Sequence, residues 1–323
     1  MASHGLIIAQ APLPDPGPVY PQGMATGRFA PSPTGILHLG NLRTALASWL
    51  SARASGSPWI IRMEDVDGPR CHRRLGEDQL RDLTRLGLES DIPVVWQSDR
   101  TAAYLTALQQ LHDTGRLYPC ACSRRDLARL ASAPHLEDGL RPYDGLCRHV
   151  PEGPFHLDAL RLQIPAGPVS WMDRLLGPQV DDPALLTGDP LLCRRDGCFA
   201  YHLAVVVDDA AQGVEEVVRG QDLRSITATQ IRIQEALGLP RPAYAHLGMV
   251  TAPDGTRLGK RDGALGLETL AGRGISAEAV LGWLGWSLGC LDEPRPVQAA
   301  DLVPTFRWEK VPAGPLAMPA AWL

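Results

Sequence analysis

Hydrophobic positions in the first part of the chain switch between a helical spacing and short continuous apolar runs. Residues 40–54 carry apolar side chains three and four positions apart, which predicts a helix. Residues 58–65, PWIIRMED, predict a buried strand that ends in Glu64 and Asp65. With the strand-like start at Arg28, these segments predict a β-α-β unit.

Three later segments also have the pattern of helices. Residues 98–115 predict a helix with Ser98 as its N-cap and Gly115 just beyond its last turn. Residues 223–238 and 276–288 place apolar side chains on one face at helical spacing. The last of these helices belongs to a smaller C-terminal region.

A second group of strands is expected in the middle of the chain. Residues 200–209, AYHLAVVVDD, are a continuous apolar run of the kind that buried parallel strands show. Residues 213–220, GVEEVVRG, form a further strand that would pair beside it. Alternating strands and helices of this kind indicate an α/β fold with a mainly parallel sheet.

Composition narrows the class of protein. The chain has 323 residues, of which 45% are hydrophobic and 21% charged, as in globular proteins with a large core. A net charge of -5 argues against a protein that coats nucleic acid by bulk electrostatics. Seven cysteines in a chain of this length favour reduced thiols or a metal site over a disulfide framework.

The N-terminal segment is unlike the rest of the chain. Residues 1–26 are rich in proline, which favours an extended, disordered leader that stands outside the fold. The segment has no basic region followed by a long apolar stretch, so we expect no signal peptide. No other window approaches the roughly 20 apolar residues of a membrane span. A cytoplasmic protein is therefore expected.

Candidate chemistry begins at residues 28–41, RFAPSPTGILHLGN. A strand that ends in a Pro- and Gly-rich turn and leads into a helix N-terminus is suited to bind an anion, because free N–H groups and the helix dipole face the ligand. His38 and Asn41 stand at that N-terminus and could donate hydrogen bonds to a phosphate. Alternatively, His38 only caps the helix or packs at its start.

A second candidate element is the polar, Gly-rich segment 251–265, TAPDGTRLGKRDGAL. It places Lys260 between Arg257 and Arg261. Such a loop could close over a triphosphate and neutralise the leaving pyrophosphate through its lysine. Most basic loops are simply solvated, so the segment alone is weak evidence.

Three cysteines form an independent pattern. Cys120 and Cys122 are two positions apart, and Cys147 follows with Tyr143 four positions before it. Three thiolates can hold three corners of a tetrahedral zinc site, while a phenol is an unusual fourth ligand and His149 is near enough to compete. The alternative is a set of reduced cysteines without a metal.

Taken together, these motifs resemble those of a known enzyme family. HLGN and RLGKR stand where class I aminoacyl-tRNA synthetases have their HIGH and KMSKS signatures. RFAPSPTG, IRMEDVD, YHLAVVVDD and VVRGQDLRSIT resemble the glutamyl branch of that class, from about Arg28 to about Leu288. Only residues 262–323 follow the KMSKS-like loop, which leaves no room for the anticodon-binding region of full-length members. The chain thus resembles the truncated paralogues, the glutamyl-Q tRNA(Asp) synthetases.

The resemblance implies a domain organisation and an activity. It implies a Rossmann-type catalytic domain in two halves, 27–117 and 166–250, separated by a zinc-binding insertion at 118–165 and followed by a loop and short helical region at 251–323. The implied reaction uses ATP and Mg2+ to form glutamyl-adenylate, and then transfers glutamate to the queuosine base in the anticodon of tRNA-Asp. We expect a monomer with no obligate protein partner.

The resemblance also implies site residues. Glutamate would be bound by guanidinium, carboxylate and hydroxyl groups near the strand ends, with Tyr201 and Arg219 on the later strands: Arg28, Phe29, Ala30, Pro31, Ser32, Glu64, Tyr201 and Arg219. ATP would be bound by His38, Gly40, Asn41 and Lys260, of which His38 and Lys260 are the catalytic pair. Zinc would be held by Cys120, Cys122, Tyr143 and Cys147.

Two features depart from the family pattern, and three alternatives stay open. Gly259 and Arg261 stand where KMSKS has serines, and Asn41 replaces the second His of HIGH. The alternatives are a truncated glutamyl-tRNA synthetase that charges tRNA-Glu, a non-catalytic tRNA-binding module, and another nucleotidyltransferase with a HIGH-type site. The docking of tRNA is the least specific expectation; candidate phosphate contacts are Arg124, Arg125, Arg129 and Arg148.

Overall fold

The computed structural model describes residues 26–122, 142–149, 155–256 and 265–322. The expected leader 1–26 therefore lies outside it except for its last residue, Thr26. Of the KMSKS-like segment 251–265, residues 257–264 also lie outside it.

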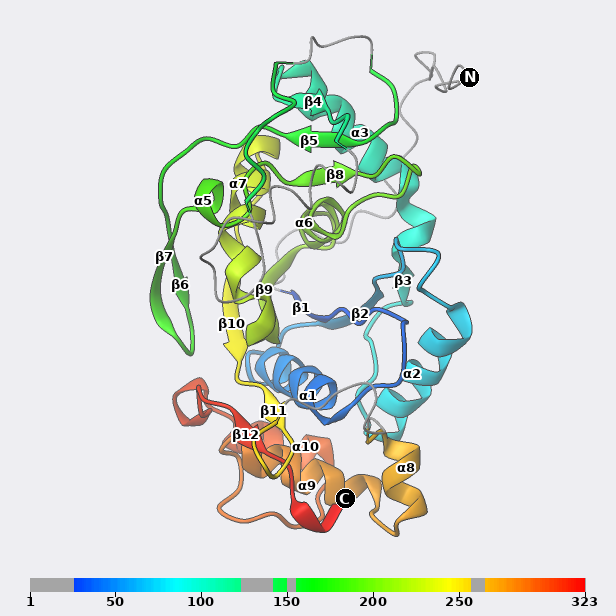
Figure 1. Ribbon diagram of the computed structural model, residues 1–323. Coiled ribbons are helices and arrows are strands. Elements are labelled where there is room, and N and C mark those ends of the chain that lie inside the picture. The colour runs from blue at the N-terminus through cyan, green and yellow to red at the C-terminus, as the bar shows by residue number, and fades with distance from the viewer. Residues whose placement is uncertain (1–25, 123–141, 150–154, 257–264, 323) are drawn as a thin grey trace.

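A seven-stranded sheet forms the centre of the molecule (Figure 1). The strand order is β3-β2-β1-β9-β10-β6-β7, and every neighbouring pair is parallel except β6 and β7. This confirms the expected α/β class with a mainly parallel sheet. The strands are β1 (Thr26–Phe29), β2 (Trp59–Met63), β3 (Val95–Trp96), β6 (Val169–Asp173), β7 (Gly177–Asp181), β9 (Val214–Gly220) and β10 (Ala243–Leu247).

Helices cover both sides of this sheet. In Figure 1, α1 lies on one side of β1 and β9, and α6 and α7 lie on the other. The predicted β-α-β unit is confirmed, because β1 and β2 pair in parallel across the connection through α1. The longer helices are α1 (Leu39–Ala54), α2 (Arg73–Arg85), α3 (Thr101–Asp113), α6 (Tyr201–Ala211) and α7 (Thr227–Leu237).

A smaller antiparallel sheet stands at one end of the molecule, at the top of Figure 1. It contains β4 (Leu117–Pro119), β5 (Leu160–Leu162) and β8 (Leu191–Cys193). The strand β8 follows the β6–β7 hairpin in the chain, with the short helix α5 (Pro183–Leu186) between them. Strand β8 thus belongs to the small sheet although it lies outside residues 118–165, the insertion that the resemblance implies.

The C-terminal region packs against the helix that follows the first strand. Leu281 and Leu284 of α9 share one hydrophobic core with Leu42 and Leu46 of α1. The region contains α8 (Leu267–Gly272), α9 (Ala277–Ser287), α10 (Ala299–Leu302) and the strand pair β11 (Val250–Thr251) and β12 (Leu316–Ala317). No helix in the described part of the chain is long and apolar enough to cross a membrane.

The prediction of a strand at residues 200–209 is wrong. These residues form most of helix α6, whose buried side chains include Leu203, Val205 and Val206. The helix is packed between α3, α7, β8 and β9, so nearly every side of it is apolar and the sequence shows no polar face. Strand β9 is correctly predicted at 213–220, but its partners are β1 and β10.

Two helix starts also differ from expectation. Ser98 is not an N-cap: it lies in a 3-10 helix, Gln97–Arg100, and its hydroxyl donates to Asp65 at 2.7 Å. The predicted helix 223–238 begins as another 3-10 helix, Gln221–Ile226, before α7 starts. The predicted ends hold, because Gly115 and Gly238 both adopt positive φ just after their helices.

Candidate active site

The candidate site lies at the carboxyl ends of the central strands. Strand β1 connects forward through α1 to β2 on one side, while β9 and β10 continue the sheet on the other. The order of strands therefore reverses between β1 and β9, which is where open α/β sheets bind their ligands. The predicted residues Arg28, Glu64 and Arg219 come from this edge.

His38 is the N-cap residue of helix α1. The His38 side chain accepts a hydrogen bond from the backbone N–H of Gly40 through Nδ1 at 3.1 Å, and the Asn41 side chain accepts from the His38 backbone at 3.2 Å. His38 therefore caps the helix, as the alternative interpretation of the sequence has it. Because Nδ1 is an acceptor, the proton of the neutral imidazole sits on Nε2. The cap and a role as phosphate donor are compatible.

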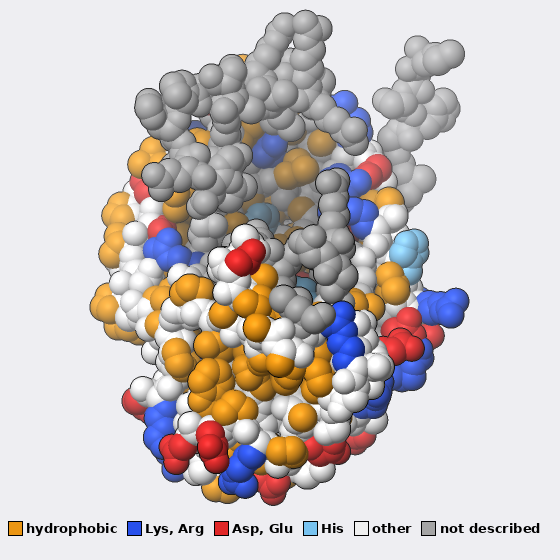
Figure 2. Space-filling view, turned by 60° about the horizontal axis from the view of Figure 1, so that its bottom comes forward, with side chains coloured by type: hydrophobic (Ala, Val, Ile, Leu, Met, Phe, Trp, Pro, Cys, Tyr) orange, Lys and Arg blue, Asp and Glu red, His pale blue; other side chains and the backbone are white. Residues whose placement is uncertain are grey.

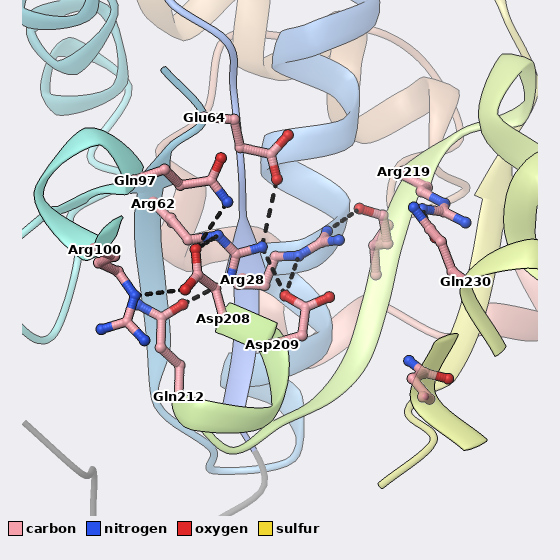
Figure 3. Close-up of polar contacts among 12 residues, drawn as sticks. Arg28, Arg62, Glu64, Gln97, Arg100, Asp208, Asp209, Gln212, Arg219 and Gln230 are labelled. Carbon is pink, nitrogen blue, oxygen red and sulfur yellow. Dashed lines mark hydrogen bonds and ion pairs between the residues drawn. The ribbon is translucent and has the colours of Figure 1, made fainter. Parts of the chain in front are cut away.

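Arg28 is held by two elements, α6 and β9, that lie far from it in the sequence. Its side chain is 3% exposed, and it donates through Nη1 to the Val218 carbonyl at 3.2 Å and through Nε to Asp209 at 3.4 Å. Figure 3 shows its guanidinium between the Asp209 carboxylate and strand β9. The residues that follow form the turn: Phe29 and Pro31 are buried, Ala30 is half-buried and Ser32 is exposed.

A buried ion network supports Arg28, and sequence reasoning missed it. Arg62, fully buried, donates to Asp209 at 2.7 Å and to Gln212 at 2.6 Å, and lies 3.9 Å from Asp208. The signal was present in the sequence: two adjacent aspartates end an apolar run, and buried carboxylates require partners. Reading that run as a strand concealed their position on one end of α6.

Glu64 follows β2 directly and is 7% exposed. Its carboxylate lies 3.4 Å from the Arg62 guanidinium. Burial raises the pKa of Glu64 to about 7, although Arg62 and Arg28 oppose the shift. A cation that enters beside it, such as an ammonium group, would favour its ionised form.

Tyr201 and Arg219 reach the site from different kinds of element. Tyr201 is the first residue of α6, so its expected place on a strand is wrong. Arg219 stands in β9 as predicted and is 4% exposed. The neighbouring His202, which sequence reasoning also missed, has its pKa lowered to about 4 by burial, with a contribution from Arg219. Its Nδ1 is buried and has no hydrogen-bond partner among the residues that the structure describes.

The three predicted cysteines come together beside the small sheet. The Sγ atoms of Cys120, Cys122 and Cys147 lie within 4.8 Å of one another. The Tyr143 hydroxyl lies 4.0 Å from the sulfur of Cys120 and 3.7 Å from that of Cys122. His149 is exposed and does not belong to this group. The cluster could hold a metal ion.

The remaining predicted residues divide into two groups. Lys260, Arg257, Gly259, Arg261 and the basic residues Arg124, Arg125 and Arg129 lie outside the described part of the chain. Arg148 is described, but its guanidinium forms a two-point ion pair with Asp189, at 2.6 and 2.8 Å. Lys and Arg are interspersed with Asp and Glu on the face shown in Figure 2.

Comparison with known proteins connects this geometry to a family. The model of the class I tRNA synthetase catalytic domain (E and Q) matches residues 24–292. A glutamyl-Q tRNA(Asp) synthetase of Geobacter sulfurreducens is 46% identical over 94% of this chain and 96% of its own length. This chain belongs to the glutamyl-Q tRNA(Asp) synthetase family. A second member, from Symbiobacterium thermophilum, is 43% identical over 92% of this chain and 97% of its own length.

Solved structures agree on the fold. A glutamate-tRNA synthetase from Elizabethkingia anophelis superposes with a TM-score of 0.77 at 24% identity, covering 93% of this chain and 69% of that protein. Membership of a class I synthetase family makes this chain a ligase-type enzyme that uses ATP, and its family acts on glutamate and tRNA. The resemblance stated from the motifs is confirmed.

Proposed function

We propose that this enzyme activates glutamate with ATP and transfers the glutamyl group to the queuosine base in the anticodon of tRNA-Asp. The structural observation that carries the proposal is the placement of two buried arginines, Arg28 and Arg219, and of Glu64 on or directly after neighbouring strands, where the charges of all three act on Tyr201. The names of the relatives supply the acceptor.

Glutamate matches this set of groups. Its two carboxylates need fixed cationic donors, and arginine binds carboxylates with two parallel hydrogen bonds. Its ammonium would be placed beside Glu64, whose raised pKa falls when a cation approaches. Ser32 and Tyr201 would add hydroxyl contacts at the mouth of the glutamate pocket. The backbone of Phe29, Ala30 and Pro31 would form part of the wall of this pocket.

The first step would be attack of the α-carboxylate of glutamate on the α-phosphorus of ATP, with pyrophosphate as the leaving group. The N-terminus of α1 would lie against the phosphates, where Nε2–H of His38 can donate while the backbone N–H groups of Gly40 and Asn41 hold the ring through the helix cap. Lys260 would neutralise charge on pyrophosphate. Mg2+ bound to the triphosphate supplies further neutralisation.

The second step would form an ester on a base. A hydroxyl of the cyclopentene ring of queuosine would attack the activated carbonyl, and AMP would leave. No enzyme nucleophile is required in either step, so the work of the protein is positioning and electrostatic stabilisation.

We assign zinc to the cysteine cluster in a structural role. The Cys122 and Cys147 sulfurs lie 3.5 Å apart, close to the edge of about 3.8 Å that a tetrahedron with Zn–S bonds of about 2.3 Å requires. The Tyr143 hydroxyl lies within reach as the fourth ligand. The ion would tie the segment around Tyr143 to the small sheet.

The test uses labelled glutamate, ATP and Mg2+ with three acceptors: tRNA-Asp that contains queuosine, tRNA-Asp that lacks it, and tRNA-Glu. Label on the queuosine-containing tRNA-Asp alone is the expected result. Label on tRNA-Glu would make the chain a small conventional synthetase. Absence of glutamate-dependent ATP–pyrophosphate exchange would favour a non-catalytic module. Exchange that survives Lys260→Ala would refute the role of the loop lysine.

A further inference from the structure

Arg219 is oriented by three hydrogen bonds within the protein. It donates through Nε to Nε2 of His246 at 3.0 Å, through Nη1 to Gln230 at 2.7 Å and through Nη2 to Thr227 at 2.8 Å. These bonds use three of the five N–H groups of a guanidinium and leave one on each terminal nitrogen. Figure 3 shows Gln230 beside the Arg219 side chain. A carboxylate can be bound by that remaining pair.

The histidine that receives the Nε bond is itself fixed. His246 stands opposite Arg219 in the parallel pairing of β10 with β9 and is fully buried. Its Nδ1 lies 2.6 Å from a carboxylate oxygen of Asp173, at the end of β6. A carboxylate accepts, so Nδ1 carries the proton and the lone pair of Nε2 faces Arg219. Burial lowers the pKa of His246, which keeps the ring neutral.

We propose that Asp173 and His246 are positioning residues that hold Arg219 in the orientation required to bind a carboxylate of glutamate. The inference rests on the proposed function, because it takes glutamate as the ligand of Arg219. Asp173 selects the tautomer of His246. In that tautomer Nε2 of His246 accepts the hydrogen bond from Arg219 Nε–H. In the other tautomer Nε2 would carry a proton, and two donors would face each other.

Asp173 offers an unusually clear way to change the tautomer alone. Its other oxygen, Oδ1, accepts from the backbone N–H groups of Leu175 and Leu176, both at 2.9 Å. In Asp173→Asn the amide oxygen stays on those two donors, so the new amide nitrogen faces His246. The amide N–H then donates to Nδ1, and the histidine proton moves to Nε2, against Arg219.

The experiment measures glutamate-dependent ATP–pyrophosphate exchange together with the His246 tautomer by 15N NMR. For Asp173→Asn we expect the proton on Nε2, a KM for glutamate raised about 10- to 100-fold, as loss of a charge-assisted hydrogen bond implies, and an unchanged KM for ATP. A normal KM for glutamate with a switched tautomer would overturn the proposal. A wild-type enzyme without exchange would instead count against the proposed function, while the tautomer could still be read.

Two variants of His246 test the same role in a protein that keeps Asp173, so the test does not depend on the folding of Asp173→Asn. His246→Gln places an amide oxygen near the position of Nε2, and His246→Asn places a donor only near that of Nδ1. We expect His246→Gln to keep the KM for glutamate within about threefold of wild type and His246→Asn to raise it as Asp173→Asn does. Equal KM values in the two variants would refute the acceptor role.

Discussion

Among the residues that support the proposed glutamate pocket, we expect substitution of Asp209 to have the largest effect. Asp209→Asn keeps the shape of the side chain but removes a charge that Arg62 contacts at 2.7 Å and Arg28 at 3.4 Å, with exposures of 0% for Arg62 and 7% for Asp209. Loss of one partner of a buried ion pair costs about 3–5 kcal/mol. The amide oxygen can still accept one hydrogen bond, so we expect about 3 kcal/mol of lost unfolding free energy.

The functional part of this prediction concerns Arg28. Once its carboxylate is neutralised, Arg28 is held mainly by the Val218 carbonyl, and the KM for glutamate should rise about tenfold. The assays are urea unfolding followed by circular dichroism, and ATP–pyrophosphate exchange over a range of glutamate concentrations.

The adjacent Asp208 provides a matched control. It is fully buried and accepts from Arg100, from Gln97 at 2.8 Å and from the Tyr104 hydroxyl at 2.7 Å, but it has no bond to Arg28. Asp208→Asn should therefore lose similar stability while the KM for glutamate stays within about twofold. The reasoning fails if both variants raise that KM equally, or if Asp209→Asn loses less than about 1 kcal/mol.

Other consequences can be tested separately. The pKa of Glu64 is raised to about 7 in the folded protein, so the unfolded chain releases this proton first as pH rises. The free energy of unfolding should therefore fall by up to about 3 kcal/mol between about pH 4.5 and 7. Urea unfolding at a series of pH values should show a flatter profile for Glu64→Gln. Arg161 donates to the Cys120 sulfur at 3.2 Å and stacks over the ring of Tyr143. Arg161→Met should therefore weaken zinc retention about 10- to 100-fold in a chelator competition. Unchanged retention would show that Arg161 does not support the proposed zinc site. Ser276 caps α9, and thermal melts should show a loss of about 1 kcal/mol for Ser276→Ala, whereas no loss would mean that the cap contributes nothing.

Local patterns were sufficient where apolar residues recur at a helical spacing or where a short apolar run ends in charged residues. The helix at 39–54 differs from its prediction by one residue at its start, and the strand ending before Glu64 lies where the apolar run placed it. The same patterns failed at residues 200–209, because a helix surrounded by other elements is apolar on nearly every side. Spacing along the chain cannot distinguish such a helix from a buried strand.

By itself the sequence determined the fold class, the family and the types of residue at the site, since motifs such as RFAPSPTG, HLGN and the Cys-x-Cys pair are short and local. Only the tertiary structure decided which groups support them. Arg28 meets Asp209 across 181 positions, and Asp173 meets His246 across 73. Both pairs form because parallel strands and the helices between them bring distant segments to one edge of a sheet, where a buried charge or ring nitrogen requires a partner.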